Sequence, residues 1–209
     1  MTGREGDLGA ATPGGEFRRL DRPVRSFVAL PCPPGLRAAV AEARRRWRSI
    51  PADAKWSDPE RIHLTLRFLG DASPRALAEL HGRLAETAAA SGSLTLSPGE
   101  TGAFPHWRRA RVLWVGFEDA GAVDRLAERV EADARASGFE PAERPFTAHL
   151  TLGRIKGPRG SRPAVEAVRD WRPESGAEEV DEMILYASEL GPAGPSHTAL
   201  ARYRLGAGA

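Results

Sequence analysis

The chain has 209 residues, of which 41% are hydrophobic and 28% are charged, and its formal net charge is +2. Such a chain can bury a core without metals or disulfides, and it fits one domain or two small lobes. The small net charge excludes a polybasic nucleic-acid coat protein, and no apolar run reaches the roughly 18–20 residues of a membrane span. The single cysteine, Cys32, cannot form an intramolecular disulfide, so we expect a reducing, cytoplasmic environment.

Residues 1–22 are rich in glycine, small and charged side chains and lack the apolar core of a signal peptide. We therefore predict a disordered leader over 1–22 and a single bilobal domain over 23–209. The first half of that domain alternates strand-like and helix-like patterns. Strands are predicted over 24–30, 62–69 and 93–97, and helices over 35–48 and from Ser73 to about residue 91.

The second half of the domain begins the same order again. Residues 111–117 form an apolar, strand-like run, and 122–137 carry apolar side chains at helical spacing. A polar loop then leads into a strand-like segment over 147–155. The remaining predicted elements are a short helix over 165–171 and strands over 180–190 and 198–205.

The most informative feature is a repeated tetrapeptide, His-Leu-Thr-Leu, at 63–66 and again at 149–152. Because successive side chains on a strand point to opposite faces, His63 and Thr65 share one face, as do His149 and Thr151. His149 follows His63 by 86 residues, and the same offset also relates the two preceding strands. The chain is thus predicted to contain two similar units, each presenting a histidine and a threonine above an apolar base.

These patterns predict an α+β fold of pseudo-two-fold, bilobal form. Two antiparallel sheets would line a central cleft, with the helices outside. Each lobe would contribute one motif strand, so that both histidines reach the same cleft.

The chain resembles the two-histidine (2H) phosphoesterases, and among them the bacterial RNA 2′,3′-cyclic phosphodiesterases of the 2′-5′ RNA ligase family. The resemblance covers about residues 25–205 and includes the flanks of both motifs. Two positions depart from the family pattern, since Ala148 replaces a common proline and His197 replaces a common tyrosine. The family segments in this chain are Ile62–Gly70, Gly102–Pro105, Arg111–Trp114, Glu143–Phe146, His149–Arg154 and Leu185–Leu190.

The resemblance implies hydrolysis of RNA 2′,3′-cyclic phosphodiester ends to 2′-phosphates, with reversible 2′-5′ RNA ligation as a related reaction. It assigns His63 as the proton donor and His149 as the proton acceptor. Histidine suits both tasks because its ordinary pKa lies near 6.5. Thr65 and Thr151 are predicted to stabilise the negative charge on the phosphate oxygens. No cofactor and no metal is expected, and we expect a monomer whose partners are RNA ends or nucleotides bearing a cyclic phosphate.

Further substrate contacts are predicted near the two motifs. Arg67 continues the exposed face of the first motif strand, and Arg144 and Arg154 flank the second, where they could bind phosphate. Phe146 could stack on a base, as could Trp107 and Trp114, although Trp114 lies in an apolar strand and core packing is favoured for it.

Three other interpretations remain open at this point. The same cleft could hydrolyse other cyclic phosphates or 2′,5′-linked oligonucleotides, or it could bind RNA ends without catalysis. A zinc site is disfavoured because threonine is a poor zinc ligand and neither motif offers a Cys, Asp or Glu two residues after its histidine.

Overall fold

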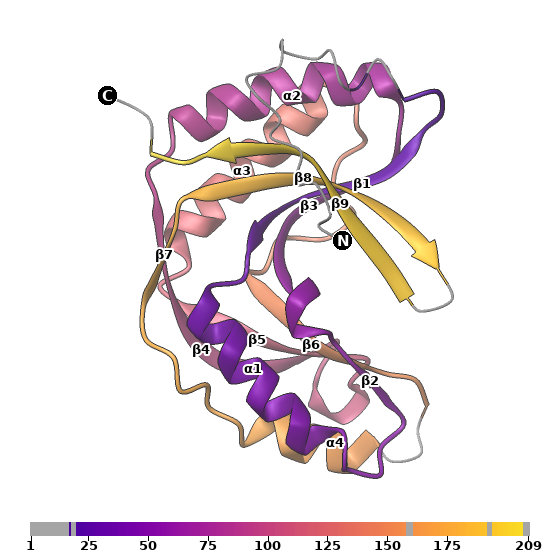
Figure 1. Cartoon of the computed structure of the whole chain (residues 1–209), viewed down its shortest axis with the longest axis vertical. Coiled ribbons are helices and arrows are strands. Elements are labelled where there is room, and N and C mark those ends of the chain that lie inside the picture. Colours follow the sequence, from indigo (N-terminus) through magenta and orange to yellow (C-terminus); the bar gives the residue numbers. More distant parts are fainter. Residues whose placement is uncertain (1–16, 18–19, 158–160, 192–193, 207–209) are drawn as a thin grey trace, which may run out of the picture.

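The computed structural model describes Phe17 and residues 20–157, 161–191 and 194–206. Figure 1 shows the strands curling around the inner side of the molecule, with the helices on the outer side. None of the described helices is long and apolar enough to cross a membrane. The elements are β1 (Val24–Pro31), α1 (Pro34–Trp47), β2 (Ala54–Trp56), η2 (Pro59–Arg61), β3 (His63–Ala72), α2 (Pro74–Ala89), β4 (Leu94–Phe104), η3 (Trp107–Arg109), β5 (Val112–Glu118), α3 (Gly121–Ala136), β6 (His149–Ile155), α4 (Ser161–Arg169), β7 (Glu178–Val180), β8 (Glu182–Gly191) and β9 (Gly194–Arg204).

All strand pairs are antiparallel, and the strands follow the order β7-β4-β5-β6-β3-β1-β8-β9, with β2 also paired to β6. The sheet has two parts, β1-β3-β8-β9 and β2-β4-β5-β6-β7, which meet where β3 lies beside β6. Only one residue pair, Leu64 and Leu150, joins β3 to β6. The predicted α+β class with antiparallel strands lining a central groove is confirmed, but the two predicted sheets form one curled sheet.

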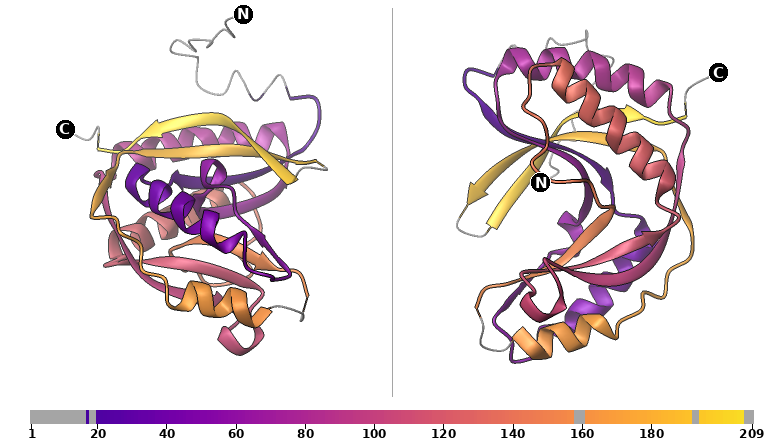
Figure 2. Two further views of the ribbon diagram at one scale, coloured as in Figure 1. Left: turned by 60° about the horizontal axis from the view of Figure 1, so that its bottom comes forward. Right: turned by 180° about the vertical axis from the view of Figure 1, so that it is seen from behind.

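Helices from both halves of the sequence cover each part of the sheet. On the outer face of β1-β3-β8-β9, α2 packs against α3 and β9, and α3 packs against β3. On the other part, α4 packs against β4 and β5. The Trp47 ring of α1 lies 4.9 Å from the Trp56 ring of β2 and 5.2 Å from the Trp171 ring. Figure 2 shows the same arrangement from two further sides.

The N-terminus of α1 is held by a side chain from far along the sequence. The Glu178 carboxylate on β7 accepts hydrogen bonds from the backbone N–H groups of Gly35 and Leu36, at 2.8 and 3.0 Å. These bonds satisfy two of the donors that every helix N-terminus leaves without an intrahelical partner. They lower the pKa of Glu178, against the opposing effect of its burial. The contact fastens the first helix to the β4-β7 edge, so the two halves of the sequence exchange elements.

The apolar sides of the predicted elements form the core. Leu64 and Leu150 are 1% and 0% exposed, which confirms the predicted direction of the motif leucines. Helix α2 begins as predicted, since the Ala76 N–H donates to the Ser73 hydroxyl at 3.2 Å. Its buried face is formed by Leu77, Leu80, Leu84 and Ala88.

The predicted bounds differ most from the structure where polar or glycine-containing segments form strands. Residues 54–56 form a short strand, although no strand is predicted between the helix over 35–48 and the strand over 62–69. Strand β4 is predicted to end at residue 97 but continues past Pro98 and Gly99 to Phe104. Its register to β5 shifts between Pro98 and Thr101, which accommodates these two residues in the strand.

The predicted leader over 1–22 lies largely outside the described residues. Within it, Phe17 is 2% exposed, and its ring lies 5.2 Å from that of His81 on α2. Leu20 also packs against the core. These two apolar side chains are covered by the domain, and residues 1–16 and 18–19 of the predicted leader lie outside the described residues.

We expect Leu150→Ala to lower the free energy of unfolding by about 2–5 kcal/mol, the usual cost of a leucine-sized cavity in a core. Leu150 is completely buried at the junction of the two parts of the sheet, so both parts lose contacts. Chemical denaturation would measure the change, with Leu200→Ala as a matched control because Leu200 is only partly buried. Equal losses in both variants would contradict a tightly packed junction.

Candidate active site

The pairing of β3 with β6 brings the two motifs together. In an antiparallel pair at Leu64 and Leu150, His63 lies next to Thr151, and Thr65 lies next to His149. The two histidines therefore occupy diagonal positions, whose α-carbons are typically about 7–8 Å apart. Because the leucines point into the core, all four polar side chains share the inner face of the sheet.

Each of the two imidazoles makes the same kind of hydrogen bond to the backbone. Nδ1 of His63 lies 2.9 Å from the carbonyl oxygen of Arg61, and Nδ1 of His149 lies 2.7 Å from that of Thr147. In each case the carbonyl belongs to the residue two positions earlier. A carbonyl can only accept, so Nδ1 carries a proton and Nε2 is the nitrogen available for proton transfer.

Aromatic rings surround the His63 imidazole. The Phe27 ring stacks on it with the centroids 4.6 Å apart, and the His197 ring meets it edge-on at 5.2 Å. The Tyr186 ring lies at 6.1 Å. His197 reaches this position because β9 pairs with β8, where His197 is opposite Ser188.

Different rings surround His149. The Phe104 ring meets it edge-on at 5.0 Å, and the Trp114 ring lies at 6.1 Å. Trp114 can lie flat across β4 because its cross-strand partner is Gly102, where a Cβ would come within 2.0 Å of the indole ring. The prediction that Trp114 belongs to the core is wrong, since Leu113 and Val115 fill the core side of β5 and Trp114 points to the inner face.

Burial lowers the pKa of both histidines. The pKa of His63 falls from 6.5 to about 4, chiefly because the aromatic surroundings disfavour the charged imidazolium, and the nearby His197 adds to this effect. The pKa of His149 is also lowered, first by burial and further by the positive charge of Arg154. The hydrogen bonds to the two carbonyls oppose both shifts. Both imidazoles are thus neutral at neutral pH in the empty site.

Each motif strand contains an extra residue at the second leucine of the motif. Leu66 on β3 has no partner on β1, and Leu152 on β6 has no partner on β5. Such a bulge reverses the face to which the following side chains point. Leu152 follows Leu66 by the same 86 residues that separate the histidines, so the bulge is repeated with the motif.

The first bulge turns Arg67 away from the histidines. Arg67 is opposite the buried Val28, and its guanidinium pairs with the carboxylate of Glu131 on α3. It also donates to the backbone carbonyls of Phe68 and Glu140, and its side chain is only 11% exposed. The prediction that Arg67 faces the cleft is therefore not met, because the exposed parity of the strand does not continue through the bulge.

The residues that follow Arg67 and Gly153 occupy the inner face instead. Phe68 is 57% exposed, and its ring lies 5.9 Å from that of Phe27, on the His63 side. Arg154 is opposite Val112, which shares a face of β5 with Trp114. Arg154 therefore lies on the same face as His149, as its effect on the pKa of that histidine also indicates.

The other predicted contact residues lie at different distances from the motifs. Arg144 is exposed in the loop before β6, and Phe146 is partly buried against the core. Trp107 is covered by Arg169, whose guanidinium carbon lies 5.0 Å from the ring centroid. Sequence reasoning gave no role to His197 as a neighbour of His63, and only the departure from the family tyrosine drew attention to it.

Within the described part of the chain, no group of three or more His, Cys, Asp or Glu side chains is placed to hold a metal ion. The single cysteine, Cys32, is buried, and burial raises its pKa to about 12. A thiol held in this protonated form is a poor nucleophile.

A two-histidine phosphoesterase is the class that this fold and these paired motifs define. The profile of the family described as LigT like phosphoesterase matches residues 30–114 and 116–197. The chain belongs to this family.

Curated relatives share most of the chain. A protein of Methanothermobacter thermautotrophicus named RNA 2′,3′-cyclic phosphodiesterase is 34% identical over 183 residues, which cover 87% of this chain and 99% of that protein. An Aquifex aeolicus protein of the same name is 31% identical, over 88% of this chain and 98% of that protein. The crystal structure of a Thermus thermophilus protein superposes with a TM-score of 0.72 at 29% identity, over 88% of this chain and 98% of that one. Escherichia coli LigT complexed with 3′-AMP gives a TM-score of 0.67 at 28% identity, over 88% and 98%.

We expect the free energy of unfolding to depend on pH through His63. Its pKa is about 4 in the folded protein and near 6.5 when unfolded, so the unfolded chain binds the proton first on acidification. Stability contributed by the neutral imidazole is fully present above pH 6.5 and is lost as the pH falls toward 4, by about 1.4 kcal/mol for each pKa unit. Denaturation of the wild type and of His63→Gln across this range would measure it, and identical slopes would contradict the shift.

Proposed function

We propose that the chain hydrolyses 2′,3′-cyclic phosphodiesters at RNA ends and leaves a 2′-phosphate, by acid–base catalysis with two histidines and without a metal. The observation that carries this proposal is the pairing of Leu64 with Leu150, which sets both His-x-Thr motifs on one face. The names of the curated relatives support cyclic phosphodiester hydrolysis. The complex of Escherichia coli LigT with 3′-AMP supports nucleotide binding in this fold.

In the proposed first step, the cyclic phosphate lies between the two histidines. Nε2 of His149 is unprotonated and takes a proton from the attacking water. The water oxygen bonds to phosphorus while the bond from phosphorus to O3′ breaks. Nε2 of His63 gives its proton to O3′, so that the leaving group departs as a hydroxyl.

His63 must be protonated for this step, although its pKa in the empty site is about 4. The phosphodiester carries a negative charge, and an opposite charge at close range raises the pKa of an imidazole. Substrate binding therefore supplies the proton donor in its active form. The nearby Arg154 acts in the opposite sense on His149, whose pKa it lowers, so His149 stays neutral as the base.

Thr65 and Thr151 are proposed to bind the two non-bridging oxygens. Each threonine lies beside the histidine of the other motif, so each end of the phosphate meets one hydroxyl and one imidazole. Hydroxyl donors held on strands cost little reorganisation as negative charge develops.

The same groups can catalyse a related reaction, 2′-5′ joining, when a 5′-hydroxyl replaces water as the nucleophile. His149 then takes the proton of the hydroxyl, and a 2′-5′ phosphodiester forms. Water is present at about 55 M, so hydrolysis prevails unless the second RNA end is held in place.

We expect His63→Ala and His149→Ala each to lower kcat for hydrolysis of a 2′,3′-cyclic nucleotide by about 10²–10⁴-fold, as for loss of a general acid or base. Circular dichroism and thermal melting would show that the fold is retained. His106→Ala is the matched control, since His106 is exposed and lies outside both motifs. Activity retained in either motif variant would refute the assignment.

We expect full activity in excess EDTA, because protons and hydroxyl groups alone carry the proposed chemistry. The rate of hydrolysis would be compared before and after extensive chelation, followed by addition of divalent ions. Loss of turnover that returns only with an added metal would overturn the metal-free mechanism.

A further inference from the structure

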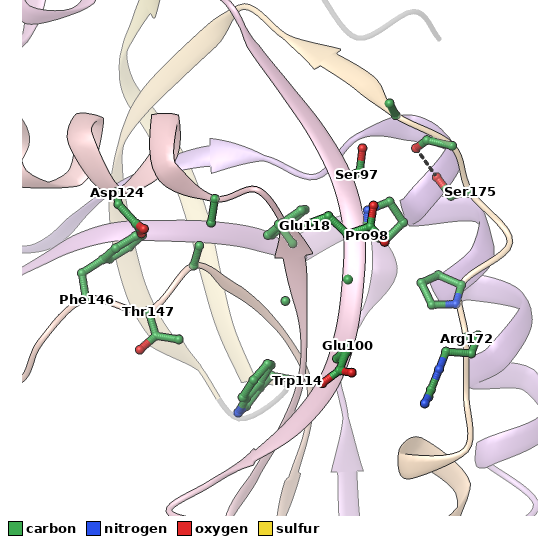
Figure 3. A pocket seen from close by; sticks show the side chains of 18 residues that line it. Ser97, Pro98, Glu100, Trp114, Glu118, Asp124, Phe146, Thr147, Arg172 and Ser175 are labelled. Carbon is green, nitrogen blue, oxygen red and sulfur yellow. Dashed lines mark hydrogen bonds between the residues drawn. The ribbon is translucent and has the colours of Figure 1, made fainter.

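A pocket of about 910 Å³ lies next to the second motif (Figure 3). Its walls come from β4, β5, the start of α3, residues 146–148 and residues 172–177. Phe146 and Thr147 lie on the opposite side of the pocket from Arg172 and Ser175 (Figure 3). Since residues 146–148 lead directly into His149, the pocket adjoins the proposed proton acceptor.

On β5, the strand that pairs with β6 at His149, the pocket is lined by a residue without a side chain. Gly116 is the cross-strand partner of His149 and lines the pocket. A Cβ at this position would come within 3.2 Å of the Trp114 ring and 3.5 Å of the carbonyl oxygen of Glu100. A side chain at position 116 would stand on the inner face beside His149.

The pocket lies at the end of the site where β6 begins, on the side of His149. Because β3 and β6 are antiparallel, the beginning of β6 lies beside Thr65, whereas Arg154 near its end lies toward His63. In an in-line displacement the nucleophile approaches phosphorus from the side opposite the leaving oxygen. With His63 at the leaving O3′ and His149 at the nucleophile, the pocket is on the nucleophile's side.

We propose that this pocket binds the 5′-terminal nucleoside of a second RNA and holds its 5′-hydroxyl where water otherwise attacks. This inference rests on the proposed function. The 5′-oxygen bonds to phosphorus, the bond from phosphorus to O3′ breaks, the hydroxyl proton goes to His149, and O3′ takes a proton from His63. The product is a 2′-5′ phosphodiester, and no oxidant or further reactant is required.

The residues that line the pocket can bind the base and the ribose hydroxyls of a nucleoside without a 5′-phosphate. Trp114 and Phe146 are partly exposed and offer flat apolar surfaces on which a base can stack. Glu118 and Asp124 can accept hydrogen bonds from ribose hydroxyls or base amino groups, and their charges oppose a 5′-phosphate. Arg172, on the far wall, can bind the next phosphate of the chain.

The test fills the pocket without touching the motifs. Gly176 lines it, is exposed, and has nothing within 4 Å of an added Cβ, so Gly176→Trp can fold and occupy the space. The matched control is Gly82→Trp on α2, which is equally open but outside the pocket. Each protein is given a donor RNA with a 2′,3′-cyclic phosphate and an acceptor RNA with a 5′-hydroxyl. Joined product and hydrolysed donor are measured separately.

We expect Gly176→Trp to lower joining about tenfold or more, with a raised KM for the acceptor, since base stacking in the pocket is lost. Hydrolysis of a 2′,3′-cyclic mononucleotide should stay at the wild-type rate, and Gly82→Trp should match the wild type in both reactions. Undiminished joining by Gly176→Trp overturns the inference, and so does an equal loss of joining and hydrolysis. A wild type that hydrolyses but never joins also overturns it and leaves the hydrolytic function standing, whereas absence of hydrolysis refutes the proposed function itself.

Discussion

The pairing of Leu64 with Leu150 is the contact on which the inner face depends. It is the only residue pair that joins β3 to β6, and therefore the point at which the two parts of the sheet become continuous. Both leucines are buried in the core, so the side chains before and after them must point to the opposite side of the sheet, its inner face. Antiparallel pairing then sets each histidine beside the threonine of the other motif. A shift of one residue between the strands would send one polar pair into the core.

The surroundings of the two histidines serve two opposing demands. Burial among aromatic rings lowers the pKa values of both imidazoles, so both are neutral in the empty site. The hydrogen bonds from Nδ1 to the carbonyls of Arg61 and Thr147 fix the ring orientation and oppose that shift. Each imidazole therefore keeps Nε2, and not Nδ1, available for proton transfer. Because each carbonyl belongs to the residue two positions before its histidine, the duplicated unit includes the backbone that leads into each motif.

Much of the fold could be predicted because the duplicated pattern is local. Alternating leucines marked both motif strands, and apolar side chains at helical spacing marked α1, α2 and α3. The exchange of elements could not be predicted in this way. The bond between Glu178 and the start of α1 joins residues more than 140 positions apart, and no local pattern encodes it.

Only part of the site could be predicted, because local patterns do not give the register between strands. The motif histidines and threonines follow from repetition, whereas the side chains around them depend on sheet register. A bulge at Leu66 turns Arg67 toward Glu131, and its counterpart at Leu152 brings Arg154 to the inner face. Strand alternation alone fails at both positions. His197 lies at the far end of the sequence and meets His63 only because β9 pairs with β8.

The central claim is that the two imidazoles bind one phosphate from opposite sides. A crystal structure of the chain with a bound 2′-nucleotide would test it most directly. We predict that Nε2 of His63 contacts the ribose O3′ and Nε2 of His149 contacts a phosphate oxygen on the other side of phosphorus, with both threonine hydroxyls on the remaining oxygens. A phosphate bound by one histidine alone, or bound away from the inner face, would contradict it.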